Sequence, residues 1–171
     1  MDQAPGGRPI PDPGFAGDDG SVSPQVQSAL ASYGRGGGQG EYLAALQQLQ
    51  DARVLVPVVA VLDEVEYDEA GRAHDKTSDM AAVLLTGRDG RQALLAFTDT
   101  GALSAWDPQS RPVPVTLRKA AQAALQQGAD ALVVDVAGPV VFALEGELLD
   151  TVASGSVLVR LSEGWGWASP K

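Results

Sequence analysis

The sequence has no cysteine and only one histidine, His74, among its 171 residues. Without cysteine the chain cannot form disulfides, thiolate zinc sites, iron–sulfur clusters or a cysteine nucleophile. His74 lies in a polar, mostly acidic stretch, and the Gly-x-Ser-x-Gly pattern of a nucleophile elbow is absent from the sequence. We therefore expect no catalytic residue, no metal site and no cofactor, and we predict that the protein is not an enzyme.

Basic residues are also scarce. Lysine and arginine total 12 against 22 aspartates and glutamates, which gives a net charge of -10 at pH 7. This balance argues against a broad phosphate-binding face, so we expect neither nucleic acid nor an acidic membrane surface as a partner. The sequence contains no run of about 18 apolar residues, the length needed to span a membrane. The residues after Met1 also lack the basic and apolar regions of a secretory signal, so we expect a cytoplasmic protein.

Apolar residues make up 44% of the chain, which is enough to bury one core. Proline and glycine dominate its beginning, and Ser23 followed by proline predicts a helix start. We interpret residues 1–40 as an arm that carries a short helix over about 24–33 and ends in a glycine-rich flexible linker. We expect the domain proper over 41–155, and a C-terminal strand with a tryptophan-containing tail over 156–171.

The apolar pattern predicts the strands and helices. Val54–Leu62 is nearly continuous in apolar residues, as in a strand buried on both faces, and Pro57 within it requires an edge, a bulge or a strand start. Asp89-Gly90 between two apolar runs predicts a β-hairpin. Further helices are expected over about 41–51, from Thr98-Asp99 to Trp106, over 117–127 and over 146–153, and further strands over 81–86, 92–97, 131–136, 140–144 and 157–161. This order predicts the α/β (α+β) class: a single domain with a mixed β-sheet flanked by helices.

Three stretches resemble the N-terminal domain of the SseB family, the proteins similar to enhanced serine sensitivity protein B. They are Arg53–Val59, Gly90–Asp99 and Gly128–Asp135. The segment Asp135–Pro139 departs from the Asn-Pro-Gly-like turn that usually follows in the family. The proline- and glycine-rich residues 10–20, together with Arg111–Val115, resemble the actinobacterial branch of that family.

The resemblance implies a compact α/β domain of unknown function, loosely linked to serine sensitivity, with no agreed catalytic residues to transfer. It also suggests that residues 10–20 dock on the domain through Ile10 and Phe15. Composition alone predicts a mobile arm there, because the segment has few large apolar side chains to offset its ordering entropy.

Three functions are compatible with these observations. The first is a non-catalytic cytoplasmic module that binds an unidentified protein partner, with Phe15, Trp165 and Trp167 as contacts, since tryptophan is enriched at interface hot spots. Either tryptophan could instead fold back onto the domain.

The second function is a small-ligand sensor, for an amino acid or a nucleotide, or an uncharacterised enzyme. Sheets of this class carry pockets at the carboxyl ends of their strands, where Thr98, Asp99 and Asp135 are expected. The third is an assembly protein whose sheet edge pairs with a second copy, although short strands and Pro57 protect such edges. We expect a monomer or a weak homo-oligomer.

Overall fold

The computed structural model of the chain describes residues 14–61 and 79–170. The interpretations of Ile10, of His74 and of the acidic loop around it concern residues outside these ranges. In chain order, the helices and strands are α1 (Pro24–Gly34), α2 (Gln39–Leu49), β1 (Arg53–Val61), β2 (Asp79–Ala82), β3 (Leu84–Thr86), β4 (Gln92–Ala96), α3 (Thr100–Trp106), β5 (Arg111–Thr116), α4 (Leu117–Gln126), β6 (Ala131–Val134), β7 (Phe142–Glu145), α5 (Gly146–Ala153), β8 (Val157–Leu161) and β9 (Gly164–Ala168).

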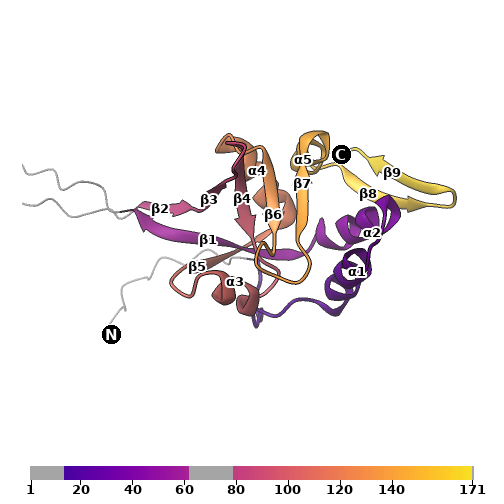
Figure 1. Cartoon of the computed structure of the whole chain (residues 1–171). Coiled ribbons are helices and arrows are strands. Elements are labelled where there is room, and N and C mark those ends of the chain that lie inside the picture. The colour runs from indigo at the N-terminus through magenta and orange to yellow at the C-terminus, as the bar shows by residue number, and fades with distance from the viewer. Residues whose placement is uncertain (1–13, 62–78, 171) are drawn as a thin grey trace, which may run out of the picture.

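Strand β1 links two sheets. It lies between β2 and β5 in an antiparallel sheet, and its residue Leu55 forms a bridge with Phe97, just after β4. The second sheet has the order β3-β4-β6-β7, in which β4 and β6 run parallel and the other pairs are antiparallel. Strands β8 and β9 form a separate hairpin, drawn in yellow at one side of the domain in Figure 1. The predicted α+β domain with a mixed sheet is therefore confirmed.

Pro57 lies where β1 changes its neighbour. Val58 pairs with β2, whereas Leu55 pairs with the end of β4. The carbonyl of Pro57 accepts a hydrogen bond of 3.1 Å from the N–H of Val83. On this edge of β1 the proline lies between two partners, so its missing N–H costs no regular sheet bond there, while the pairing with β5 on the other edge continues through Pro57.

The two faces of β4 bury different sets of side chains. Leu94 and Ala96 belong to the main core, which also contains residues of α1, α2, α4 and α5. Leu95 and Phe97 point to the opposite face and pack with Leu103 of α3 in a smaller cluster. Burial on both faces accounts for the nearly continuous apolar sequence of this strand.

Three helices begin at the residues that the sequence predicts. Ser23, Asp99 and Thr116 are the N-caps of α1, α3 and α4. Each side-chain oxygen accepts a hydrogen bond from the backbone N–H three residues later, at 3.3, 2.7 and 3.3 Å respectively. These bonds satisfy one of the unpaired donors that every helix N-terminus carries.

The glycine-rich stretch that we interpreted as a flexible linker is a tight turn between α1 and α2. The N–H of Gly37 donates to the carbonyl of Tyr33 at 3.0 Å, and the N–H of Gly38 donates to the Glu41 carboxylate at 2.9 Å. Helix α1, which we assigned to the arm, buries Val26 and Leu30 in the main core. Helix α1 is therefore part of the domain, because its apolar side chains pack in the core. A short sequence pattern does not show which distant residues these side chains contact.

Candidate functional site

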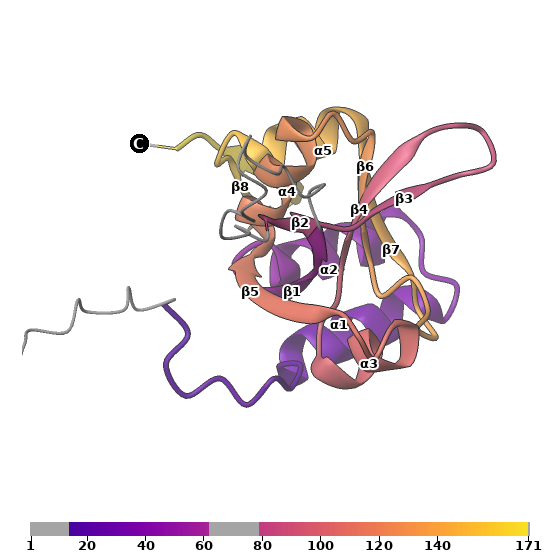
Figure 2. The same ribbon diagram turned by 90° about the vertical axis from the view of Figure 1, so that its left-hand side faces the viewer.

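The carboxyl ends of β4 and β6 meet at one edge of the sheet, because these strands are parallel neighbours. Thr98 and Asp99 follow β4, and Asp135 follows β6. The structure brings all three of these predicted pocket residues together, where they line one cavity of about 260 Å³. Helices α1 and α3 lie at the same end of the domain (Figure 2) and contribute apolar walls, among them Leu30 and Ala102; Pro139 and Val140, after β6, contribute further apolar lining.

Thr98 and Asp135 join the two strand ends by two hydrogen bonds. The Thr98 N–H donates to Oδ1 of Asp135 at 2.8 Å, and the Thr98 hydroxyl donates to Oδ2 at 2.7 Å. Asp135 itself is only 7% exposed and adopts a φ of 55°, in the left-handed region. Aspartate tolerates this conformation better than most residues, and the two bonds hold its carboxylate beside the cavity.

The electrostatics of the cavity are dominated by negative charge. Burial raises the pKa of Asp135; its bonds to Thr98 oppose this shift and the nearby charge of Asp99 adds to it. Within the described part of the chain Asp135 forms no ion pair, and no lining residue of the cavity is lysine or arginine. A positively charged group is therefore the chemical class that complements this site best.

Asp99 supplies the second carboxylate of the cavity. Its Oδ1 accepts the bond of 2.7 Å from Ala102 N–H that caps α3. The residue is half-buried, so it combines a structural role at the helix start with partial access to the cavity. An ionised carboxylate at a helix N-terminus is also favoured by the helix dipole.

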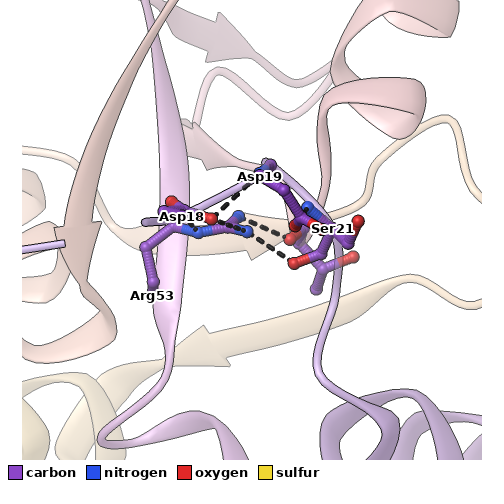
Figure 3. A network of polar contacts seen from close by, with 6 residues as sticks. Asp18, Asp19, Ser21 and Arg53 are labelled. Atoms are coloured by element: carbon purple, nitrogen blue, oxygen red, sulfur yellow. Dashed lines mark hydrogen bonds and ion pairs between the residues drawn. The ribbon is translucent and has the colours of Figure 1, made fainter. Parts of the chain in front are cut away.

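A short segment of the N-terminal arm forms part of the cavity wall. We call residues 14–22 the strap; Val22, its last residue, lines the cavity. Arg53, at the start of β1, holds the strap through paired contacts with the Asp18 carboxylate at 2.8 and 2.9 Å and a bond of 2.6 Å to the carbonyl of Ser21 (Figure 3). A fourth bond, of 2.7 Å, joins Arg53 to the carbonyl of Thr98. One guanidinium thus links the strap to a residue of the cavity.

Neither Arg53 nor Asp18 was identified as a site residue from the sequence. A lone arginine before a strand has no characteristic pattern, and its partner lies far away in the chain. The one available signal was the stretch Arg53–Val59, which carried the family resemblance. That stretch indicated a strand and gave no reason to expect an ion pair.

The predicted partner-contact residues lie in two separate parts of the chain, the strap and strand β9. Phe15 is half-buried in the strap. Trp165 of β9 packs against the main core, and the Arg160 guanidinium lies 4.8 Å from the centre of its ring. Trp167, on the same strand, is 38% exposed. Trp165 thus folds back onto the domain, whereas Trp167 presents part of its ring to solvent.

A second hollow lies between α1 and α2. This open groove has a volume of about 650 Å³ and is lined largely by polar side chains, such as Gln25, Ser28 and Gln48. These side chains are exposed and belong to neither predicted site. Small-molecule sites are usually enclosed and mainly apolar, so the smaller cavity at the strand ends is the better candidate.

Metal and membrane sites are not evident in the ranges that the structure covers. No three histidine, cysteine, aspartate or glutamate side chains of the described residues are grouped so that they could hold a metal ion. None of the helices in those ranges has the length and apolar character needed to cross a membrane.

Comparison with known proteins identifies one family. The model of the SseB protein N-terminal domain matches residues 26–151. No curated protein and no solved structure matches the chain significantly. The match begins within α1, in agreement with the packing of this helix in the main core. Placement in the actinobacterial branch stays a prediction. Since the match covers well over half of the sequence, the chain belongs to the SseB family.

Proposed function

We propose that this SseB-family domain is a non-catalytic, cytoplasmic protein-binding module that receives a lysine or arginine side chain of its partner in the cavity at the ends of β4 and β6. The observation that supports this proposal is the cavity lining itself. Two carboxylates, of Asp99 and Asp135, share a half-enclosed space with apolar walls, and no basic residue of the described lining neutralises them.

A long basic side chain matches both parts of this lining. Its aliphatic stem can contact Leu30, Ala31 and Pro139, while its charged head approaches the carboxylates. Attraction between opposite charges is stronger in a partly desolvated site than in bulk water. The net charge of -10 also favours the approach of a basic partner over longer distances.

We assign Thr98 a positioning role in this proposal. Its hydroxyl donates to Asp135 at 2.7 Å and its residue is 5% exposed, so the hydroxyl orients the carboxylate. In this proposal the Asp135 carboxylate is the group that binds the ligand.

A small amine is the second candidate ligand, because the volume of about 260 Å³ is at the lower end of the usual range for ligand pockets. An amino acid would place its ammonium group near the carboxylates, but its own carboxylate would lack a basic partner in the described lining. The same argument disfavours nucleotides, whose phosphates need cations or backbone donors.

The test compares small charged probes by NMR of the ¹⁵N-labelled protein. The probes are the blocked peptides Ac-Gly-Arg-Gly-NH₂, Ac-Gly-Lys-Gly-NH₂ and Ac-Gly-Glu-Gly-NH₂, and the free amine agmatine. We expect the basic peptides to shift the amide signals of Thr98, Asp99 and Asp135, and the acidic peptide to leave them unchanged. Binding of agmatine without either basic peptide would favour the amine sensor. Equal effects of basic and acidic peptides would contradict both proposals.

A further inference from the structure

We infer that the strap, residues 14–22, regulates access to the cavity, with Arg53 as the latch that holds it closed. This inference rests on the proposed function, because it takes the cavity to be the binding site. It adds a device that the proposed function does not require: a closed state, in which Val22 completes the wall, and an open state, in which the strap is released.

The Arg53 side chain alone makes all the contacts of the latch. Arg53 is 10% exposed, and its partner Asp18 is 22% exposed, so their paired contact is largely shielded from solvent. The same guanidinium bonds to the strap at Ser21 and to the cavity residue Thr98. Loss of this one cation would therefore break the connection between strap and cavity at several points together.

Apart from Arg53, the strap meets the rest of the described domain at its C-terminal end, where Val22 packs against the main core. Its backbone is joined to α3 by the hydrogen bond of 2.9 Å from the Thr100 N–H to the carbonyl of Gly20. As whole residues most of the strap is exposed and Phe15, Gly20 and Val22 are half-buried, while the Asp18 side chain is shielded by Arg53. A segment with so little apolar burial opens at a smaller free-energy cost than the rest of the domain.

Gly20 provides a second way to release the strap, through its contact with α3, and its own N–H also donates to the Asp18 carboxylate at 3.0 Å. Its φ is 80°, and a Cβ atom at this position would lie 2.6 Å from Cγ2 of Thr100. A side chain at residue 20 would therefore strain the left-handed backbone and press against the Thr100 side chain of α3. The Gly20→Ala change should displace the strap without altering Arg53 or Asp18.

The absence of cysteine allows a direct test of opening. Ala31→Cys places a single thiol in the cavity wall, and its reaction rate with the neutral reagent methyl methanethiosulfonate reports access. In this background we expect Asp18→Asn and Gly20→Ala each to raise the labelling rate about tenfold, in line with the loss of a charge-assisted contact. Asp19→Asn is the matched control, because Asp19 lies next to Asp18 and bonds to Ser21, but among the described residues the ion pair of Arg53 is with Asp18 and not with Asp19.

Hydrogen exchange gives the second readout. The Thr100 amide donates to Gly20 of the strap, so its exchange should accelerate in both releasing variants and stay at the wild-type rate in Asp19→Asn. Unchanged labelling and unchanged exchange in Asp18→Asn and Gly20→Ala would overturn the inference. Equal acceleration in the Asp19→Asn control would also overturn it, since the latch would then have no special role.

The outcomes separate the strap from the proposed function. Faster labelling without binding of any basic peptide would support the strap and contradict the cation-binding site. Peptide binding with the same affinity in the wild type and the two releasing variants would support the site and contradict regulation by the strap. Tighter binding in both releasing variants is the result that we expect if both hold.

Discussion

Thr98 donates two hydrogen bonds to the carboxylate of Asp135, one from its backbone N–H at 2.8 Å and one from its hydroxyl at 2.7 Å. The two residues follow parallel neighbouring strands, so this pair of hydrogen bonds fixes one strand end against the other. It also fixes a buried carboxylate at the wall of a cavity. Stability and the proposed binding role therefore depend on the same pair.

The first prediction concerns the pH dependence of stability. Burial raises the pKa of Asp135 in the folded protein, whereas the unfolded value is about 3.9. The contribution of Asp135 to the free energy of unfolding is then greatest below that unfolded value and falls as the pH rises through the raised pKa. Asp135→Asn keeps an acceptor for Thr98 N–H and tolerates the left-handed backbone. The stability of the wild type relative to this variant should therefore decrease as the pH rises above about 4, as measured by urea denaturation.

Asp130→Asn is the control for this prediction. Asp130 lies before β6, at the opposite end from Asp135, and its exposed carboxylate accepts a bond from the N–H of Gln92. The variant removes the same charge without a buried site. A relative stability that rises with pH in Asp135→Asn, or a profile that both variants share, would contradict the role of burial at Asp135.

The second prediction concerns Arg53. Arg53→Met keeps most of the apolar stem and removes the guanidinium, which leaves Asp18 without its ion-pair partner. Because the Arg53 side chain is only 10% exposed and its bonds to Thr98 and Ser21 are lost with the ion pair, we expect the free energy of unfolding to fall by about 2–4 kcal/mol. Arg118→Met is the matched control: its contact with Asp51 is 4.0 Å long and Asp51 is exposed, so the change should stay within about 0.5 kcal/mol. Equal losses in the two variants would show that burial of the Arg53 pair is not important.

The third prediction concerns the attachment of the β8–β9 hairpin. Gln50 is buried just after α2, and its side-chain amide forms two bonds with the backbone of Leu158, at 2.8 and 3.0 Å. Gln50→Leu would leave the Leu158 N–H and carbonyl buried without partners. We expect a loss of about 2–3 kcal/mol in urea denaturation.

Gln48→Leu tests whether this effect depends on the buried bonds. Gln48 lies on the exposed side of α2, so its replacement should change the free energy of unfolding by less than about 0.5 kcal/mol. Faster hydrogen exchange throughout β8 in Gln50→Leu, and not in Gln48→Leu, would show that Gln50 holds the hairpin in place. Unchanged exchange in both would contradict this role.

The fourth prediction concerns Tyr42, on α2. Its ring stacks on Phe142 at 4.7 Å between ring centres, and its hydroxyl donates to the carbonyl of Ala143 at 2.8 Å. Burial raises the pKa of Tyr42 to about 12. Because the unfolded value is about 10, stability should fall as the pH rises from about 10 through 12.

Tyr42→Phe allows this titration to be assigned. The variant should lose the tyrosinate absorbance component that titrates last and should cost about 1 kcal/mol through the missing hydrogen bond. Titration of the lost component near pH 10 would contradict the burial of this hydroxyl.

Local sequence signals account for much of the fold. The hairpin at Asp89-Gly90 and the cap at Thr116 depend on neighbouring residues, so the sequence shows them directly. The placement of Thr98 and Asp135 near one another followed from a general rule about the ends of parallel strands. What the residues there bind stays a prediction.

Other features depend on contacts between distant residues and have no local signal. Glycine-rich residues 34–40 are compatible both with a flexible linker and with a tight turn, and only the packing of α1 decides between them. The Gly-Trp-Gly-Trp alternation of β9 carries too few apolar side chains to predict a strand. The segment is a strand because its backbone pairs with β8. The contact of Arg53 with Asp18 joins two segments whose sequences do not indicate each other.

The most direct test of the central claim is a calorimetric titration of Ac-Gly-Arg-Gly-NH₂ into the wild-type protein and into Asp135→Asn, with Asp130→Asn as the control. We predict that the wild type and the control bind the peptide with the same affinity. Asp135→Asn should bind it about tenfold more weakly, as expected for the loss of one charge-assisted contact. Equal affinity in all three proteins, or no binding by the wild type, would contradict the proposed recognition of a basic side chain at the ends of β4 and β6.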